Sequence, residues 1–483
     1  YGRVMPWRSR SRSRDGRWRA LAGPHSAVLT TQVPLEDEDD ATVCEFDVRA
    51  GERVPFVLTY EPSHMPAADP IDPIERLEQT ERFWRDWAGR CEYDGDWPDA
   101  VSRSLITIKA MTYAPTGGIV AAPTTSLPED VGGVRNWDYR FCWLRDAVFA
   151  IQSLISAGYR DEARDWGDWL LRAIAGSAAQ LQPCYGIAGE RRTEEREIDW
   201  LPGYRDSRPV RIGNDAYGQL QLDCFGSVLD AFHHARTSGL KLHDDGWQLE
   251  SNLVRHLEDL WQKSDEGIWE IRSDGRHFVH SKVLCWVAFD RAIKAIERFG
   301  RTGPLARWRS IRDRIHREVC DRGFDRSRGT FTQYYDGKAL DAANLLIPIL
   351  GFLPPDDPRV VGTVDAIQRE LSRDGLLLRY DTDVTDDGLP GKEGVFLACS
   401  FWLVDNLVLQ RRNDEASRLF ERLLALRNDV GLLAEQFDVR IGAQVGNFPQ
   451  AFSHFALIDS ALNFTSSGQA VEDVDARQAR RRG

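Results

Sequence analysis

Two glutamates of this chain combine a carboxyl group with apolar or aromatic neighbours. Glu270 directly follows Trp269 in the segment 264–280, and Glu435 follows the apolar run at 432–434. Apolar surroundings disfavour the ionised form of a carboxyl group and raise its pKa. Two carboxyl groups in different environments can supply one proton donor and one proton acceptor, as hydrolysis of a glycosidic bond requires. The chain has 75 acidic residues, however, so an ordinary surface or ion-paired role is the competing interpretation.

A stretch from Arg135 to Tyr159, beginning RNWDYRFCWLRD, is dense in aromatic and charged residues and leads into an apolar helical pattern. Aromatic faces can stack on a sugar ring, while arginine and aspartate can hold its hydroxyl groups. Trp143, Arg145 and Asp146 are the candidates here. Packing of the loop against the protein is the alternative that these residues leave open.

A second loop with similar residues runs over 182–214. It offers Trp200, Tyr204 and Arg211 for holding a second ring. Three histidines, His277, His280 and His454, flank the segments of the two glutamates, with no carboxylate or cysteine at metal-ligand spacing. We expect them to give hydrogen-bonding support, and we expect no metal and no cofactor. A phosphate or magnesium requirement is left open.

Twelve helices are expected to position these residues, from apolar residues at three- and four-residue spacing. Tight turns alternate with long aromatic and charged loops at 177–214, 264–280, 374–393 and 428–447. The expected helices cover 98–113, 146–157, 160–176, 215–236, 245–263, 281–298, 304–320, 341–349, 358–373, 394–410, 414–427 and 448–463.

This alternation predicts six helical hairpins closed into a toroid, an all-α (α/α)6 barrel. The helices that begin near 146, 215, 281, 341, 394 and 448 are the more apolar and would form the inner ring. Because the long loops precede inner helices, they should gather at one end of the barrel, where a functional site is expected. An open helical solenoid is the alternative, but no motif recurs at a fixed period.

The chain is expected to have four parts. Residues 1–65 alternate short β-rich runs with turns and suggest the C-terminal part of a truncated β-sandwich domain. Residues 66–95 form a linker helix, 96–465 the barrel, and 466–483 a polar, disordered tail. The first residue is Tyr1 rather than methionine, so we expect a fragment that lacks an N-terminal piece.

Composition excludes some partners. The net charge of −13 argues against nucleic acid and anionic membrane, which call for basic patches. No run of eighteen apolar residues is present to span a membrane. Eight cysteines without a C-x-x-C pair favour free thiols and a reducing, cytoplasmic location.

Over about residues 95–463 the chain resembles the family 15 glycoside hydrolases, the glucoamylase and trehalase family. Seven ordered motifs carry the resemblance: RNWDYRFCWLRD, LPGYRDSRPVRIGN, DEGIWEIR, RHFVHSKVLCWVAFDRA, EGVFLACSFWL, GLLAEQFD and VGNFPQAFSH. The resemblance implies an (α/α)6 barrel preceded by a β-sandwich. It also implies an inverting mechanism, for which the two catalytic carboxyl groups should lie roughly 6.5–9.5 Å apart to admit a water.

By this resemblance Glu270 is the general acid and Glu435 the general base. Arg145 and Asp146 would grip the terminal glucose, with Trp143 either touching it or packing. Arg379 matches another sugar-contacting arginine, with a helix-end salt bridge as the alternative, and Trp269 would shape the pocket wall.

The motifs are most similar to those of bacterial α,α-trehalases. They predict a small-molecule α-glucoside as the partner, with trehalose cleaved to glucose. A glucoamylase-like hydrolase of maltooligosaccharides or dextrins is the alternative, because the two activities would share the glucose-gripping subsite. A non-catalytic carbohydrate-binding protein and a purely structural toroid are further alternatives. A homo-oligomer is left open.

Overall fold

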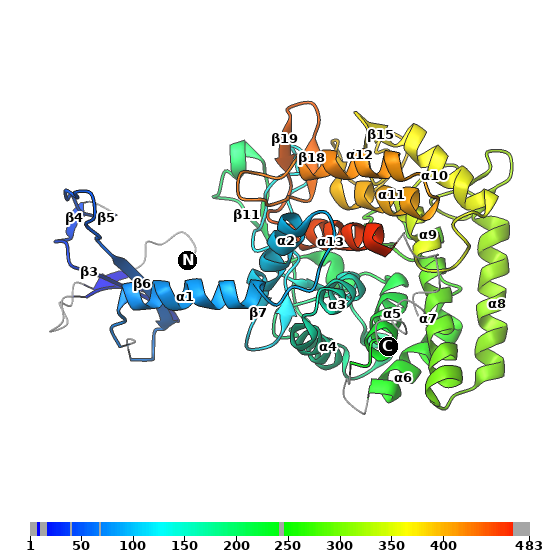
Figure 1. Ribbon diagram of the computed structural model, residues 1–483, viewed down its shortest axis with the longest axis horizontal. Coiled ribbons are helices and arrows are strands. Elements are labelled where there is room, and N and C mark those ends of the chain that lie inside the picture. The colour runs from blue at the N-terminus through cyan, green and yellow to red at the C-terminus, as the bar shows by residue number, and fades with distance from the viewer. Residues whose placement is uncertain (1–6, 10–16, 39–40, 67–68, 241–245, 467–483) are drawn as a thin grey trace. The chain divides into compact units, whose positions relative to one another are not determined.

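The computed structural model describes residues 7–9, 17–38, 41–66, 69–240 and 246–466 (Figure 1). The chain divides into two compact units, 1–89 and 90–483. The division lies within the linker helix segment expected at 66–95. The tail expected from 466 onward lies almost wholly outside the described residues.

The first unit contains a four-stranded antiparallel sheet in the order β1-β2-β3-β6, a hairpin of β4 and β5, and helix α1. Asp72 begins α1 by accepting the backbone N–H groups of Ile74 and Glu75, as an N-cap residue does. On β6, Phe56, Leu58 and Tyr60 form an exposed apolar row. The elements are β1 (Trp7–Ser9), β2 (Trp18–Ala22), β3 (His25–Thr31), β4 (Glu36–Glu38), β5 (Ala41–Val43), β6 (Phe56–Pro62) and α1 (Pro73–Ala88).

In the second unit, each of the twelve expected helices has a counterpart among the described residues. They are α2 (Pro98–Ala110), α3 (Asp146–Ser156), α4 (Arg160–Ile174), α5 (Asp223–Thr237), α6 (Gly246–Leu260), α7 (Val279–Phe299), α8 (Leu305–Arg322), α9 (Leu346–Ile349), α10 (Pro358–Glu370), α11 (Leu397–Leu409), α12 (Asn413–Leu424) and α13 (Ala451–Ser466).

Two helices differ from the expected boundaries. The helix expected at 215–236 is a short 3-10 turn, Asp215–Gly218, followed by an extended Gln219 and then α5. The Asn214 side chain caps that turn by accepting the N–H of Ala216. The helix expected at 341–349 is likewise a 3-10 turn, Ala342–Leu345, before α9, because the Asp341 side chain caps the turn there.

The inner helices close into a ring. Helix α3 contacts α5, α5 contacts α7, α7 contacts α9, α9 contacts α11, α11 contacts α13, and α13 returns to α3 (Figure 1). An open solenoid would leave its first and last helices apart. The fold is therefore an (α/α)6 barrel, as the sequence predicted, and the inner ring consists of the predicted helices.

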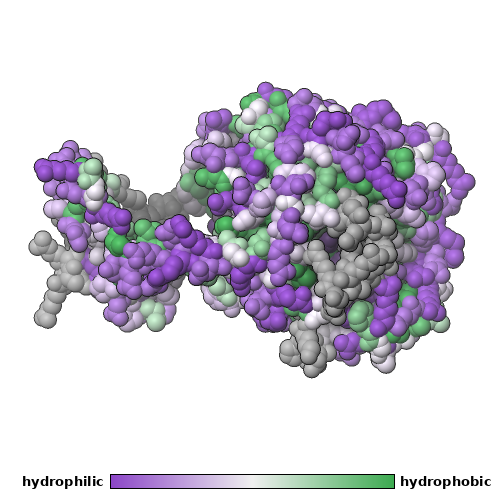
Figure 2. Space-filling model, viewed as in Figure 1, coloured by the Kyte–Doolittle hydropathy of each residue, from purple (hydrophilic) through white to green (hydrophobic). Residues whose placement is uncertain are grey.

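Burial separates inner from outer helices. In α11, 12 of the 13 residues are buried, whereas α12 buries only Ala416, Phe420, Leu423 and Leu424. The visible face of this unit is accordingly mostly hydrophilic, with hydrophobic residues in small separate patches (Figure 2). Inner helices approach closely at small residues: a Cβ on Gly226 of α5 would lie 2.3 Å from the carbonyl oxygen of Leu284 on α7.

Short strand pairs join the loops that precede the inner helices. They are β7 (Thr112–Tyr113) with β8 (Gly118–Ile119), β9 (Cys142–Trp143) with β10 (Cys184–Tyr185), β11 (Arg196–Ile198) with β12 (Val210–Ile212), β13 (Phe324–Asp325) with β14 (Thr330–Phe331), β15 (Ser372–Arg373) with β16 (Leu376–Leu377), and the three-stranded β17 (Val395–Phe396), β18 (Gln436–Asp438) and β19 (Ala443–Val445).

The inner helices surround a cavity of about 620 Å³. Arg291 of α7 is the main link across its wall. It donates to Asp230 of α5 at 2.6 Å, to Asp290 at 2.6 Å and to the carbonyl oxygen of Leu350 at 3.0 Å. This buried arginine therefore joins three consecutive parts of the ring.

All eight cysteines lie in the described part of the chain and are free, five of them buried. Across the described ranges, no helix is both long and apolar enough to cross a membrane.

Candidate active site

Glu270 lies in the turn between α6 and α7. Its backbone has φ of +52°, which is uncommon for a residue with a side chain and holds the carboxyl group in a fixed direction. Trp143 Nε1 donates to Glu270 Oε1 at 3.0 Å, and Arg145 Nη1 lies 3.3 Å from the same oxygen. Burial raises the pKa of this carboxyl group, while Arg145, Arg379 and the Trp143 hydrogen bond oppose the rise.

Arg145 and Asp146 stand at the first turn of α3. Arg145 Nε donates to Asp146 Oδ1 at 2.8 Å, and Arg145 Nη1 donates to the carbonyl oxygen of Ile268 at 3.2 Å. The guanidinium also lies 4.7 Å from the ring centre of Phe452. The stretch 135–159 is thus fastened to the loop of Glu270, and Arg145 and Asp146 lie beside it as the sequence predicted.

Glu435 immediately precedes β18, in the centre of the β17-β18-β19 sheet. Its carbonyl oxygen accepts the N–H of Leu397, the first residue of α11. Tyr139 Oη donates to Glu435 Oε1 at 2.8 Å, and Gln450 Nε2 lies 3.5 Å from it. The side chain is buried, and this burial raises the pKa of Glu435 to about 7, with Arg379 and then Tyr139 opposing the rise.

Two aromatic residues that pack against each other each donate a hydrogen bond to one of the two carboxyl groups. Tyr139, which donates to Glu435, packs edge-on against Trp143, which donates to Glu270, with ring centres 5.5 Å apart. Both aromatic residues belong to the same short segment. One stretch of sequence therefore supports both glutamates, although they are 165 positions apart.

Arg379 belongs to a buried ion-pair network, and its positive charge lowers the pKa of both glutamates. It donates to Glu393 through Nε at 2.7 Å and Nη2 at 2.5 Å, and Arg135 donates to the same carboxylate at 2.5 Å. Arg135 also pairs with Asp387 at 2.8 Å. In this structure Arg379 is therefore held by a salt bridge, which was the alternative interpretation. Its contact with a sugar stays a prediction.

Trp269 is buried and held from both sides. Its Nε1 donates to Asp341 at 2.9 Å, and its ring packs edge-on against Phe396 at 5.1 Å. Arg379 lies 5.5 Å from the centre of the ring. These contacts fix the ring next to Glu270 in the sequence, and its predicted place in the pocket wall stays a prediction.

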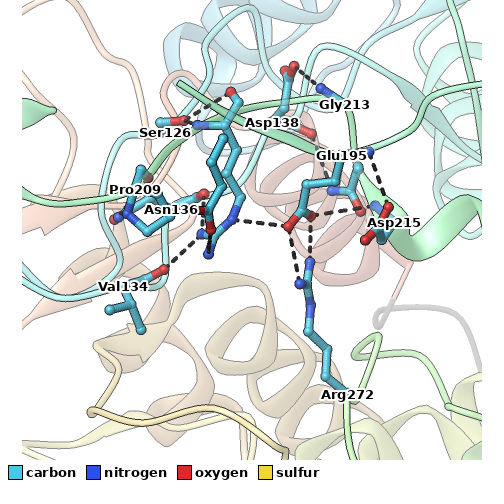
Figure 3. A network of polar contacts seen from close by, with 12 residues as sticks. Ser126, Val134, Asn136, Asp138, Glu195, Pro209, Gly213, Asp215 and Arg272 are labelled. Atoms are coloured by element: carbon cyan, nitrogen blue, oxygen red, sulfur yellow. Dashed lines mark hydrogen bonds and ion pairs between the residues drawn. The ribbon is translucent and has the colours of Figure 1, made fainter. Parts of the chain in front are cut away.

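Arg211 on β12 uses its donors within the protein. Nη1 donates to the carbonyl oxygens of Val134 at 2.9 Å and Asn136 at 3.0 Å, and Nε lies 3.0 Å from Glu195. Figure 3 shows Glu195 also binding Arg272, at 2.6 Å. Arg211 therefore fastens the start of the aromatic stretch to the β11–β12 hairpin, and its predicted hold on a second sugar ring stays a prediction.

Trp200 and Tyr204 lie in the loop that joins β11 to β12. Their side chains are 43% and 51% exposed, whereas Trp143 and Trp269 are buried. Both side chains are therefore open to solvent over about half of their surface. Their role as a platform for a second ring stays a prediction.

The three histidines differ in their surroundings. His454 Nε2 accepts the N–H of Leu433 at 3.2 Å and its Nδ1 lies 2.9 Å from Ser104 Oγ, which fixes the chain just before Glu435. His280 is buried near Arg145, and burial lowers its pKa to about 3. His277 stacks on Tyr335. Of the three histidines, His454 gives the expected hydrogen-bonding support, because it holds the backbone just before Glu435.

Sequence reasoning missed four polar residues that surround the site: Glu129, Asp341, Glu393 and Gln450. Glu129, Asp341 and Gln450 are buried, and the side chain of Glu393 is 3% exposed. The four residues come from four different loops. Tyr139 was visible within the aromatic stretch but was not selected as a candidate. Its position four residues before Trp143, in the same aromatic stretch, was the available signal. The other four residues carry no local signal.

The fold and site together define a class of protein: an (α/α)6 barrel with two carboxyl groups, arginines and aromatic rings gathered at the ends of its loops. Comparison with known proteins identifies the family. The profile of glycosyl hydrolases family 15 matches residues 95–462, and the chain belongs to that family.

Relatives of known name include several trehalases. The trehalase of Mycobacterium tuberculosis is 45% identical over 81% of this chain and 58% of its own length. The trehalase of Thermoplasma acidophilum is 38% identical over 89% of this chain and 73% of its own. The chain thus spans somewhat more than half of the first of these relatives.

Among solved structures, a bacterial glucoamylase complexed with acarbose is similar in fold. Its TM-score is 0.69 at 14% sequence identity, covering 93% of this chain and 73% of that one. At this identity the likeness concerns the fold.

Proposed function

We propose that this chain is an inverting, exo-acting α-glucoside hydrolase that releases glucose, with α,α-trehalose as its substrate. The observation that carries the proposal is the pair of carboxyl groups, Glu270 and Glu435, supported in common by Tyr139 and Trp143. Family membership and the trehalase names of its relatives support the reaction and the substrate.

In the proposed reaction Glu270 gives its proton to the glycosidic oxygen as the bond to C1 breaks. Glu435 takes a proton from a water molecule whose oxygen bonds to C1 from the opposite face. Arg145 and Asp146, held together at 2.8 Å, offer a donor and an acceptor to hydroxyl groups of the glucose that is cleaved off. The separation of the two carboxyl groups expected for inversion, roughly 6.5–9.5 Å, belongs to this proposal.

Stereochemistry tests the mechanism. Inversion of trehalose releases one glucose as the β-anomer, while the leaving glucose keeps its α-configuration. Proton NMR at early times should therefore show both anomers in equal amounts. Release of α-glucose alone would mean retention and would refute the assignment of Glu435 as a base for water.

Substrate choice is tested by measuring glucose release from trehalose, maltose, maltooligosaccharides and isomaltose side by side. The proposal expects the highest kcat/KM for trehalose. Faster release from longer maltooligosaccharides than from trehalose would replace it by a glucoamylase-like activity. The similarity of fold to a bacterial glucoamylase is the observation that keeps this second candidate in the comparison.

A further inference from the structure

A third acidic side chain, that of Glu129, approaches the same glycine as the proposed base. Gly446 connects the two: its N–H donates to the carbonyl oxygen of Pro128 at 2.7 Å, and its φ is +82°. A Cβ on Gly446 would lie 3.1 Å from Glu435 Oε2 and 3.9 Å from Glu129 Cγ. Both carboxyl side chains thus lie within 4 Å of one point, over a glycine that leaves room for them.

Both carboxyl groups are almost fully buried, Glu129 being 2% and Glu435 4% exposed. Within the described part of the chain, Oε2 of Glu129 and Oε2 of Glu435 have no hydrogen-bond partner, and neither does the side-chain oxygen of Gln450. Two buried carboxylates beside the same glycine would repel each other strongly. One of the two must therefore keep its proton.

Hydrogen bonding indicates which one ionises. Glu435 receives the hydroxyl of Tyr139 at 2.8 Å, a donor that stabilises its anion. The nearby cation Arg379 is held in a two-pronged pair with Glu393, so little of its charge is free for Glu129. Consistent with this, burial, followed by the charges of Glu435 and Glu393, raises the pKa of Glu129 well above its usual range.

We propose that Glu129 is a positioning residue that stays protonated beside Glu435 and holds the base in place for the attacking water. This inference rests on the proposed hydrolysis. The charged and titratable groups that face the pair are Arg135, Tyr139, Arg145, Arg379 and Glu393.

The test compares Glu129→Gln with Glu129→Ala in the full chain. Glutamine is neutral and can donate, so it should keep kcat within about threefold and leave the acidic limb of the pH profile in place. Alanine removes the donor and should lower kcat by roughly 10–100-fold at little-changed KM. A shift of the acidic limb to lower pH in Glu129→Gln would mean that Glu129 is charged, and wild-type kinetics in Glu129→Ala would mean that it positions nothing; either result overturns the proposal.

A readout independent of turnover follows the proton itself. The infrared difference spectrum of wild type minus Glu129→Gln at pH 7 should contain a protonated-carboxyl band, and a difference spectrum without that band would overturn the proposal. Asp459→Asn is the matched control: burial raises the pKa of Asp459 well above its usual range, so this variant should lose its own band while keeping the wild-type pH profile. If wild type releases no glucose from any α-glucoside, the proposed function fails, while the infrared band still decides the proton on Glu129.

Discussion

At the scale of single residues, the site depends on carboxyl groups that the protein removes from water. Glu435 is the clearest case, since it is buried, has one hydroxyl donor and has a pKa of about 7. A group this unfavourably placed is expected where function, rather than stability, selects it.

Replacing either glutamate should abolish most of the turnover. We expect Glu270→Gln and Glu435→Gln each to lower kcat by at least roughly 10²-fold, the contribution typical of general acid–base catalysis. Glucose release from trehalose measures the effect. Glu297→Gln, an exposed residue of α7 paired with Arg309, is the control and should keep wild-type activity. Near-normal turnover in either site variant would contradict the assignment.

The same substitution at Glu435 should stabilise the protein. Its folded-state pKa of about 7 lies above the ordinary value of 4.5, so ionisation costs the folded state stability as pH rises between these values. Glu435→Gln removes this cost. At pH 8 we expect Tm to rise by at least roughly 2–4 °C, the shift that about 1 kcal/mol gives. The difference should shrink near about pH 4, where both forms are neutral; a lower Tm at pH 8 would show that the carboxylate is stabilising.

The sequence revealed Glu270, Glu435, Arg145 and Asp146 because each stands in a distinctive local setting. Glu129 has no such setting: it follows a proline in an ordinary polar loop, and its partner Glu435 is 306 positions away. Likewise, the bond from Arg211 to the backbone of Asn136 depends on how two distant loops meet. Contacts of this kind are properties of the fold and leave no periodic signal.

At the scale of elements, helix type and order were predictable because burial on one or more faces imposes a period on the sequence. Outer helices such as α12, which buries four residues on one side, follow it most clearly. The boundaries that differed, at 215–222 and 341–345, are places where an asparagine or aspartate caps a 3-10 turn. Side-chain caps compete with helix locally and override the apolar pattern.

The β18–β19 hairpin permits a matched test of how an element places the base. Gly446→Ala should lower kcat by roughly 10–100-fold, because the added Cβ would lie 3.1 Å from Glu435 Oε2 and displace it. Gly442→Ala in the same hairpin is the control. Gly442 also has a positive φ, +63°, but nothing lies within 4 Å of its Cβ position. Equal losses in both variants would point to backbone strain rather than to the position of the base.

At the scale of the whole molecule, the ring is held by buried ion pairs as well as by apolar packing. Arg291→Met should leave Asp230 and Asp290 buried with less compensation and lower the free energy of unfolding by roughly 3–5 kcal/mol. Denaturant titration measures this loss, and kcat at 25 °C should stay unchanged because the pairs lie at the later halves of the inner helices. Arg309→Met, which breaks an exposed pair with Glu297, should cost at most about 1 kcal/mol. A similar small loss for Arg291→Met would show that the ring does not depend on it.

The inner helices also have an electrical consequence. Helices α3, α11 and α13 all begin at the site, at Asp146, at Leu397 beside Glu435, and just after Gln450. The N-terminal end of a helix carries about half a positive elementary charge from its aligned peptide dipoles. These ends therefore direct positive potential toward a sugar ring that itself becomes cationic during cleavage.

Arg145 and Arg379 are each paired with a carboxylate, so their positive charges add little to this potential. The anion of Glu435 has to offset the potential, in addition to accepting a proton. Glu435→Gln removes both the negative charge and the proton acceptor, whereas Glu270→Gln removes only the proton donor. With a substrate whose leaving group needs no protonation, Glu270→Gln should recover much of its activity, and Glu435→Gln should remain slow.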